Sequence, residues 1–302
     1  MGWRNVIITQ HSKLSYSMNM MIVQNKDGIN QIPIEDINLI LISTSQAVIT
    51  SALISKLIEN KSKLIFIDNK YNPIGETSGY HSSGKRLKLL KKQIAWPKDR
   101  IEILWTKIII SKIQNQINVL KNYNLNSINV ENILNRVELN DSTNCEAIAA
   151  RKYFLELFGN KFSRRDSNII DAALDYGYAI LLSACNREIA INGYLSELGI
   201  HHCSVNNEFN LGCDLMEPFR PIIDYWVKSH ENIKEFTPDI KYGLVELLST
   251  QIKFNGKKTL LTQAVKIFIR DCFRFLNGEI KTLRIEVDLL DEVPNSAIND
   301  NV

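Results

Sequence analysis

The sequence predicts an α+β protein in which a small β-rich N-terminal domain precedes a larger all-α domain. Residues 1–75 contain short runs rich in β-branched residues, separated by turn pairs such as Asp27-Gly28 and Asn72-Pro73. From residue 101 onward, apolar residues recur at the three- and four-residue spacing of long helices. A chain of 302 residues with 45% hydrophobic content is long enough to fill two modest cores.

The individual elements follow from these two periodicities. The β-rich runs expected to form strands are 4–9, 18–24, 39–43 and 63–68. One helix over 47–60 is expected to pack on this sheet, because Ile54, Leu57 and Ile58 fall near helical spacing. The long helices expected in the second domain, over residues 101–285, are 101–120, 145–158, 169–191 and 259–275.

Residues 76–100 are expected to link the domains as a Gly/Ser-rich loop followed by a basic helix. This helix carries a narrow apolar stripe of Leu87, Leu90 and Ile94, and Asp99 is its single acid. Such a basic face suits a phosphate backbone, although an ordinary solvated helix explains it as well. The candidate DNA-binding residues here are Lys85, Arg86, Lys88 and Lys92.

Charge is distributed unevenly along the chain. The net charge is +3, yet residues 286–302 hold five acids and no Lys or Arg, so the remainder is distinctly basic. A basic body suits a polyanionic partner. The acidic tail has few apolar residues and is expected to be disordered.

The sequence excludes several classes of protein. It has no signal-peptide pattern and no apolar stretch long enough to span a membrane, so we expect a cytoplasmic protein without a membrane partner. Walker, GxGxxG and GxSxG motifs are missing. Five widely spaced cysteines are expected to be reduced, and a structural zinc site is a weak alternative because paired ligand spacing is lacking. The residues of that alternative are His201, His202, Cys203 and Cys213.

Imidazole and carboxylate side chains gather between residues 199 and 221. Asp214 and Glu217 stand three residues apart, so on a helix they share one face and could converge on a cation with His202. Oxygen ligands with one imidazole suit Mg²⁺ or Mn²⁺. A capping box, with Asp214 as N-cap and Glu217 at N3, explains the spacing equally well. Under either interpretation Pro218 begins or bends a helix.

Another carboxylate is predicted to face the core. Glu146 falls on the same helical stripe as Tyr153 and Leu157. Burying it alone would cost too much, so it must be paired, hydrogen-bonded or bound to metal.

Arginines flank these carboxylates. Arg164 and Arg165 precede the helix over 169–191, and Arg220 follows the acidic cluster. Guanidinium groups bind phosphates through two parallel hydrogen bonds, so all three are candidate DNA contacts. Each of them could equally be a structural ion-pair partner.

The segment Cys213-Asp-Leu-Met-Glu-Pro-Phe-Arg-Pro221, with a histidine fifteen residues before Glu217, resembles the signature of the CRISPR-associated integrase and endonuclease family that inserts new spacers. The blocks at residues 32–38, 146–154 and 175–181 are similar to other parts of the same family, so the resemblance covers about residues 3–285. It implies a β-rich dimerisation domain and an α-helical catalytic domain that holds one divalent cation, Mg²⁺ or Mn²⁺.

The resemblance also assigns roles. The family's glutamate, histidine and acidic ligands correspond to Glu146, His202 and Glu217, the candidate catalytic and metal-binding residues, with Asp214 in an accompanying acidic position and His201 a bystander. The chain departs from the family at Asp171 and Asp175, where asparagines are common, and these acids stay outside the candidate site. The dipeptide Glu217-Pro218 is similar to the type II branch.

The resemblance implies a metal-dependent integrase that joins a DNA 3′-hydroxyl to a CRISPR repeat by transesterification. The implied partners are double-stranded DNA as spacer precursor and repeat, a second copy of the chain, a small adaptation subunit completing a heterohexamer, and the type II RNA-guided nuclease. A metal-dependent nuclease of branched DNA and a non-catalytic DNA-binding scaffold remain alternatives.

Overall fold

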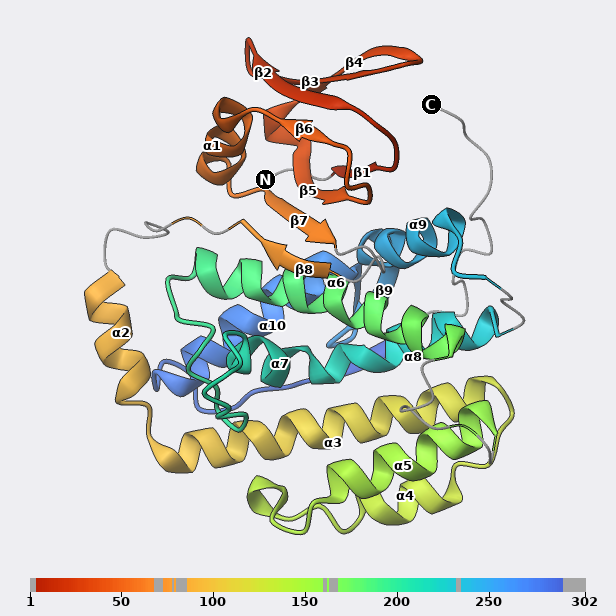
Figure 1. Ribbon diagram of the computed structural model, residues 1–302. Helices are drawn as coiled ribbons and strands as arrows, with labels where there is room; N and C mark the ends of the chain where they lie inside the picture. Colours follow the sequence, from red (N-terminus) through yellow and green to blue (C-terminus); the bar gives the residue numbers. More distant parts are fainter. Residues whose placement is uncertain are drawn as a thin grey trace. The chain divides into compact units, whose positions relative to one another are not determined.

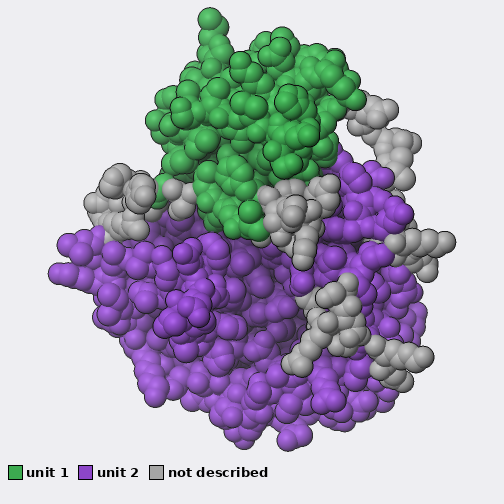
Figure 2. All heavy atoms as spheres, in the orientation of Figure 1, with its two compact units in different colours: residues 1–84 green, residues 85–302 purple. Residues whose placement is uncertain are grey.

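The computed structural model describes residues 4–67, 73–77, 79, 86–159, 162, 168–231 and 235–289. The chain divides into two compact units, residues 1–84 and residues 85–302 (Figure 2). Unit 1 is mainly β and unit 2 mainly helical, which confirms the predicted α+β class. Among the described residues, no helix combines the length and the apolar character needed to cross a membrane.

The described part of unit 1 is built from two four-stranded sheets, one α-helix and one 3₁₀ turn (Figure 1). The first sheet has the order β1-β5-β7-β8, in which β1, β5 and β7 are parallel and β8 is antiparallel to β7. Its strands are β1 (Arg4–Ile8), β5 (Ile37–Ile42), β7 (Lys63–Ile67) and β8 (Pro73–Glu76). The second sheet, β4-β3-β2-β6, consists of β4 (Gly28–Pro33), β3 (Met20–Asn25), β2 (Lys13–Ser17) and β6 (Val48–Ile49).

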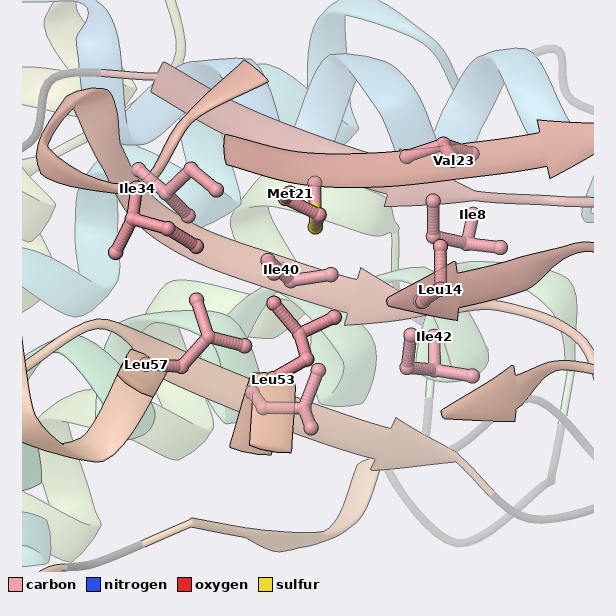
Figure 3. Packing of buried hydrophobic residues seen from close by; sticks show 11 residues of the cluster. Ile8, Leu14, Met21, Val23, Ile34, Ile40, Ile42, Leu53 and Leu57 are labelled. Carbon is pink, nitrogen blue, oxygen red and sulfur yellow. The ribbon is translucent and has the colours of Figure 1, made fainter. Parts of the chain in front are cut away.

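The core of unit 1 forms around β5. All six of its residues, five of them apolar and the sixth Asn38, are buried, as is usual for a central parallel strand. Met21 from β3, Ile40 from β5 and Leu53 from helix α1 (Ser51–Glu59) belong to one buried cluster (Figure 3). The hydroxyl of Thr50 caps α1 by accepting a hydrogen bond from the Leu53 amide at 3.4 Å.

The structure shifts several predicted boundaries in unit 1. The strand expected at residue 18 begins at Met20, because Met18 and Asn19 adopt left-handed φ angles of 47° and 62° in a tight turn. The helix expected at residue 47 begins at Ser51, since β6 precedes it. The predicted linker loop is wrong at its start, where residues 75–76 belong to β8; residues 78 and 80–84 lie outside the described part.

Unit 2 is organised around α3 (Lys98–Asn122), a helix of 25 residues that packs against α4, α5, α8 and the short 3₁₀ helix η3 (Figure 1). The N-terminal and central helices are α2 (Arg86–Ile94), α4 (Ile128–Leu134), α5 (Cys145–Phe158) and α6 (Ile169–Ile191). The remaining helices are α7 (Asn210–Met216), η3 (Glu217–Phe219), α8 (Arg220–Ser229), α9 (Pro238–Glu246) and α10 (Leu261–Leu276); η1 (Ile34–Asp36) in unit 1, η2 (Leu139–Asp141) and η4 (Leu247–Ser249) are single 3₁₀ turns. The bounds of α5 and α6 match the predicted ranges.

Unit 2 also contains a small sheet that the sequence did not predict. Its order is β10-β9-β11, with strands β9 (Gln251–Phe254), β10 (Lys257–Leu260) and β11 (Val287–Leu289). Strand β11 lies in the tail that was expected to be disordered, and this expectation is wrong for residues 286–289. Val287 pairs with Phe254 and is buried, which gives the acidic segment an apolar anchor. Residues 290–302 lie outside the described part.

The basic helix α2 forms as predicted, but its apolar stripe does not face a core. Leu87 and Ile94 are 68% and 75% exposed, whereas the polar Gln93 is buried. The Gln93 amide donates to the Leu195 carbonyl at 2.8 Å and accepts from the Leu195 amide at 2.9 Å. The side of α2 that is buried is therefore held by hydrogen bonds from the Gln93 side chain to the Leu195 backbone and not by its apolar stripe.

Candidate active site

Two candidate carboxylates from different elements meet at one lysine. Glu146 lies in the first turn of α5 and Glu217 begins η3. The Lys112 ammonium, from the middle of α3, lies 2.6 Å from Glu146 Oε1 and 2.5 Å from Glu217 Oε2. The side chains of Lys112 and Glu217 are 6% and 3% exposed, and that of Glu146 is 22% exposed. The sequence-based expectation that Glu146 must have a partner is confirmed.

Glu217 has a second cationic partner in Arg220. The guanidinium donates to Glu217 Oε1 at 2.9 Å and lies 4.1 Å from the centre of the Tyr178 ring. Burial would raise the pKa of Glu217, but the nearby charges of Arg220 and Lys112 lower it to about 2. Glu217 is therefore ionised at any physiological pH.

Behind Arg220 lies a second buried acid. The Tyr178 hydroxyl donates to Asp224 Oδ1 on α8, where Asp224 is almost fully buried. Burial raises the pKa of Asp224 to about 6, although Tyr178 and Arg220 favour its charged form. Tyr178 thus links the two groups, since its ring lies against the Arg220 guanidinium and its hydroxyl bonds to Asp224.

His202 is held by Asp214. The Asp214 carboxylate, which is fully buried in α7, lies 2.6 Å from His202 Nδ1. It also accepts backbone hydrogen bonds from Ile200, His201 and His202 at 2.7, 3.0 and 3.1 Å. The hydrogen bond to Asp214 raises the pKa of His202. The negative charges of Glu217 and Glu146 raise it further, so the imidazole interacts electrostatically with both glutamates.

This geometry rules out the capping-box interpretation of Asp214. Asp214 lies inside α7 rather than at a helix start, so the capping box is wrong. With four donors on its two oxygens, Asp214 holds the loop of residues 200–202 and orients the histidine. An imidazole whose Nδ1 is bonded to a carboxylate presents Nε2 to a cation. Pro218 does bend the chain, because η3 separates α7 from α8.

Local structure explains how the two glutamates are positioned. The Asp141 carboxylate caps α5 by accepting from the amides of Cys145 and Glu146 at 2.8 and 3.0 Å. The Asn115 side chain on α3 donates to the Pro218 carbonyl at 2.7 Å. One residue of α3 thus fixes the η3 turn while another, Lys112 one helical turn earlier, contacts the glutamates.

Gly199 allows the histidine loop to approach α7. A Cβ atom at this position would lie 2.2 Å from the His202 carbonyl oxygen and 2.8 Å from Asp214 Oδ2. Both distances are far below van der Waals contact, so only glycine fits here. On the other side of the loop, the His201 ring stacks on Trp105 at 4.1 Å between ring centres.

The carboxylates and the imidazole of this site are potential ligands of a divalent cation. Within the described part of the chain, no three His, Cys, Asp or Glu side chains are gathered closely enough to share a metal ion, a result that also counts against zinc at residues 201–213. Even so, Glu146 and Glu217 already converge on one cation, the Lys112 ammonium. Carboxylates with an imidazole are ligands that Mg²⁺ and Mn²⁺ accept, so the residues fit the ion in chemistry.

The structure distributes the remaining predicted residues differently. Arg220 is engaged by Glu217 and Tyr178, as its ion-pair alternative required. Lys88 and Lys92 are exposed on α2, and Lys92 lies 3.8 Å from Glu279. Lys85, Arg164 and Arg165, together with the side chain of Arg86, lie outside the described residues.

Sequence reasoning missed Lys112 and Asp141. Lys112 follows Ile108 by four residues and so falls on the buried face of an isoleucine-rich helix. A charge on an apolar stripe is the same signal that selected Glu146, and it could have selected Lys112. Asp141 gave no such signal, because its capping role depends on the left-handed residue Asn144 between it and the helix.

Comparisons with known proteins identify the family of the chain. The family model described as CRISPR associated protein Cas1 matches residues 6–264. The CRISPR-associated endonuclease Cas1 of Neisseria meningitidis serogroup C (strain 8013) is 36% identical over 83% of this chain and 85% of its own length.

The chain belongs to the Cas1 family. Solved structures share the fold of this Cas1-family chain. A casposase bound to its integration product aligns with a TM-score of 0.76 and 19% identity, covering 93% of this chain and 92% of the casposase. The Cas6–RT–Cas1–Cas2 complex aligns with a TM-score of 0.71 and 18% identity, covering 91% of this chain and 35% of the other.

Proposed function

We propose that this chain is the DNA integrase of CRISPR adaptation. It joins the 3′-hydroxyl of a spacer precursor to a CRISPR repeat by transesterification, with Mg²⁺ or Mn²⁺ at Glu146, His202 and Glu217. The observation that carries the proposal is the convergence of two carboxylates from separate helices on one cation position, beside a histidine that a buried aspartate orients. The Cas1 family membership and the likeness to a casposase on its integration product support it.

The chain's own residues do the positioning. Glu146, His202 and Glu217 would hold the cation, which would polarise the target phosphodiester and lower the pKa of the attacking 3′-hydroxyl. Asp214 fixes the orientation of His202, and Arg220 keeps Glu217 charged. Phosphoryl transfer depends mainly on alignment and charge neutralisation, so no nucleophilic side chain and no energy cofactor is needed.

The assembly we propose follows from the relatives. Cas1 and Cas2 occur together in the complex that this fold resembles, so we propose a homodimer bridged by a small adaptation subunit as a heterohexamer. The identity with the Neisseria protein and the dipeptide Glu217-Pro218 support the type II branch with its RNA-guided nuclease. Exposed lysines on α2, including Lys88 and Lys92, provide a basic face for double-stranded DNA.

A strand-rejoining assay on labelled branched DNA, the reverse of integration, tests the function. We expect rejoined product with Mn²⁺, and none with EDTA, with Glu217→Ala or with His202→Ala. Glu156→Ala, on the same helix as Glu146 but not part of the cluster, is the matched control and should retain activity. Shortened strands instead of rejoined ones would identify a nuclease, and DNA that is bound but unchanged would identify a scaffold.

A further inference from the structure

Lys112 occupies the position between the two candidate metal-binding carboxylates. Its ammonium contacts one oxygen of each, at 2.6 Å for Glu146 and 2.5 Å for Glu217. The side chain is 6% exposed and comes from the centre of a long helix, so the contact is built into the fold. No role in the proposed reaction has so far accounted for it.

Charge balance shows what this lysine does to the site. Glu146 and Glu217 carry two negative charges, and Lys112 and Arg220 balance them with two positive charges. Asp214, at His202, and Asp224, near Arg220, add negative charge at the edge of this group, but a divalent cation on the same two glutamate oxygens would still lie next to the Lys112 ammonium. Repulsion between two cations at such a short distance is strongly unfavourable away from water. Either Lys112 leaves when the cation enters, or the cation binds poorly.

The lysine is able to leave. An ammonium group on a flexible four-carbon stem is a point charge that can be moved without a change in the backbone. The Glu146 side chain is 22% exposed and that of His202 is 43% exposed, so one side of the cluster reaches solvent. Arg220 is less free, because it lies over the Tyr178 ring as well as against Glu217.

We infer that Lys112 is a positioning residue that stands in for the divalent cation, holding Glu146 and Glu217 together in the metal-free protein and setting the metal affinity by having to be displaced. The inference rests on the proposed metal site and adds a regulation to it. Removing the ammonium should therefore strengthen metal binding, whereas a purely structural ion pair should leave it unchanged.

The test is Mn²⁺ binding to the full chain without DNA, measured by calorimetry. Lys112→Met keeps most of the length of the side chain and removes the charge, and we expect Mn²⁺ affinity to rise on the order of tenfold or more. Mn²⁺ should also raise the melting temperature of this variant more than that of the wild type. Lys63→Met is the matched control, because Lys63 is equally buried and lies 2.5 Å from Glu76 in unit 1.

Each outcome decides something. Mn²⁺ binding that Glu217→Gln abolishes, but that Lys112→Met does not strengthen, would overturn the role of Lys112 and leave the metal site intact. No Mn²⁺ binding at this site in any variant would overturn the proposed metal site and this inference together. If Lys112→Met is unfolded without metal, Lys112→Gln is measured in its place. If both are unfolded, refolding by Mn²⁺ supports the inference and failure to refold contradicts it.

Discussion

Two buried lysines, one in each unit, differ in the number of carboxylates with which they form ion pairs. Lys63 in unit 1 and Lys112 in unit 2 have side chains that are each 6% exposed, and each lies 2.5 Å from a glutamate. Among the described residues, Lys63 has one such partner, Glu76, on the neighbouring strand β8. Lys112 has two, brought together from α5 and η3. Burial and bond length do not separate a structural ion pair from a candidate site, but the number of converging acids does.

The origins of the partners reinforce this difference. Glu76 and Lys63 belong to adjacent strands of one sheet, so strand pairing alone brings them close. Glu146 and Glu217 are 71 positions apart in sequence, and each is held in place by its own device, the Asp141 cap and the Asn115 hydrogen bond. Separate hydrogen bonds that hold two like charges close together are expected where a cation is bound.

The largest expected effect is on catalysis. Glu146→Gln keeps a hydrogen-bonding oxygen near Lys112 but removes one of the two negative charges, and we expect strand rejoining to fall to background. Glu76→Gln makes the same change in unit 1 and should leave the rate unchanged. Rates are measured on branched DNA with saturating Mn²⁺. Activity retained in Glu146→Gln would show that this residue is not part of the metal site. The ion pairs of Lys112 and Lys63 would then be equivalent, both structural.

Stability should separate the two lysines next. Without metal, Lys112→Met leaves Glu146 and Glu217 close together with Arg220 as the cation at Glu217, and we expect a loss of about 3–5 kcal/mol in the unfolding free energy of unit 2. Lys63→Met removes the ion pair of a single carboxylate, that of Glu76, whose side chain is 11% exposed, and should cost unit 1 about 1–3 kcal/mol.

Each unit can be followed separately in this experiment. Three of the four tryptophans, Trp96, Trp105 and Trp226, lie in unit 2, so tryptophan fluorescence in urea reports its unfolding once Trp3, the tryptophan of unit 1, is replaced by phenylalanine in every variant. Hydrogen exchange of the β7 and β8 amides reports on unit 1. Equal losses in the two variants would mean that Glu217 draws its stabilisation from Arg220 and that Lys112 adds no more than Lys63 does.

The sequence predicted the fold class, two helix ranges and the candidate acids, because these depend on local periodicity. It missed Lys112 because the partners of a buried charge depend on tertiary structure. The isoleucine run shows that residue 112 faces inward, but it does not show that two glutamates contact it. For the same reason it left Asp214 open between cap and ligand. The three-stranded sheet was missed since its strands have only three or four residues each, too few for a periodic signal.

Acid should weaken unit 2 through Glu217. Because its pKa is lowered from the ordinary 4.5 to about 2, the stabilisation it provides is complete above about pH 5 and is lost as the pH falls toward 2. The loss should reach roughly 2 kcal/mol by pH 3. Glu217→Gln cannot lose this charge, so the stability difference between wild type and variant should shrink over the same interval in urea unfolding curves. A difference that stays constant between pH 6 and pH 3 would contradict the ion-paired state of Glu217.

The smallest expected effect concerns glycines, and it separates packing from charge. Gly199→Ala forces a Cβ against the His202 carbonyl and the Asp214 carboxylate, and should cost unit 2 about 1–3 kcal/mol. Gly75→Ala in β8 is the matched control in unit 1, because a Cβ there meets nothing within 4 Å. Its stability should change by no more than a few tenths of a kcal/mol, on the order of the usual surface substitution.

Gly199→Ala should also disturb His202, and it does so without removing any charged group. If the loop shifts, the Nδ1–H proton of His202 loses its short hydrogen bond to Asp214, and its downfield NMR signal should move or broaden. Strand rejoining should slow in step with that signal, because the histidine is then aimed less well. A variant with the wild-type proton signal but slow rejoining would show that the loop serves DNA and not the histidine.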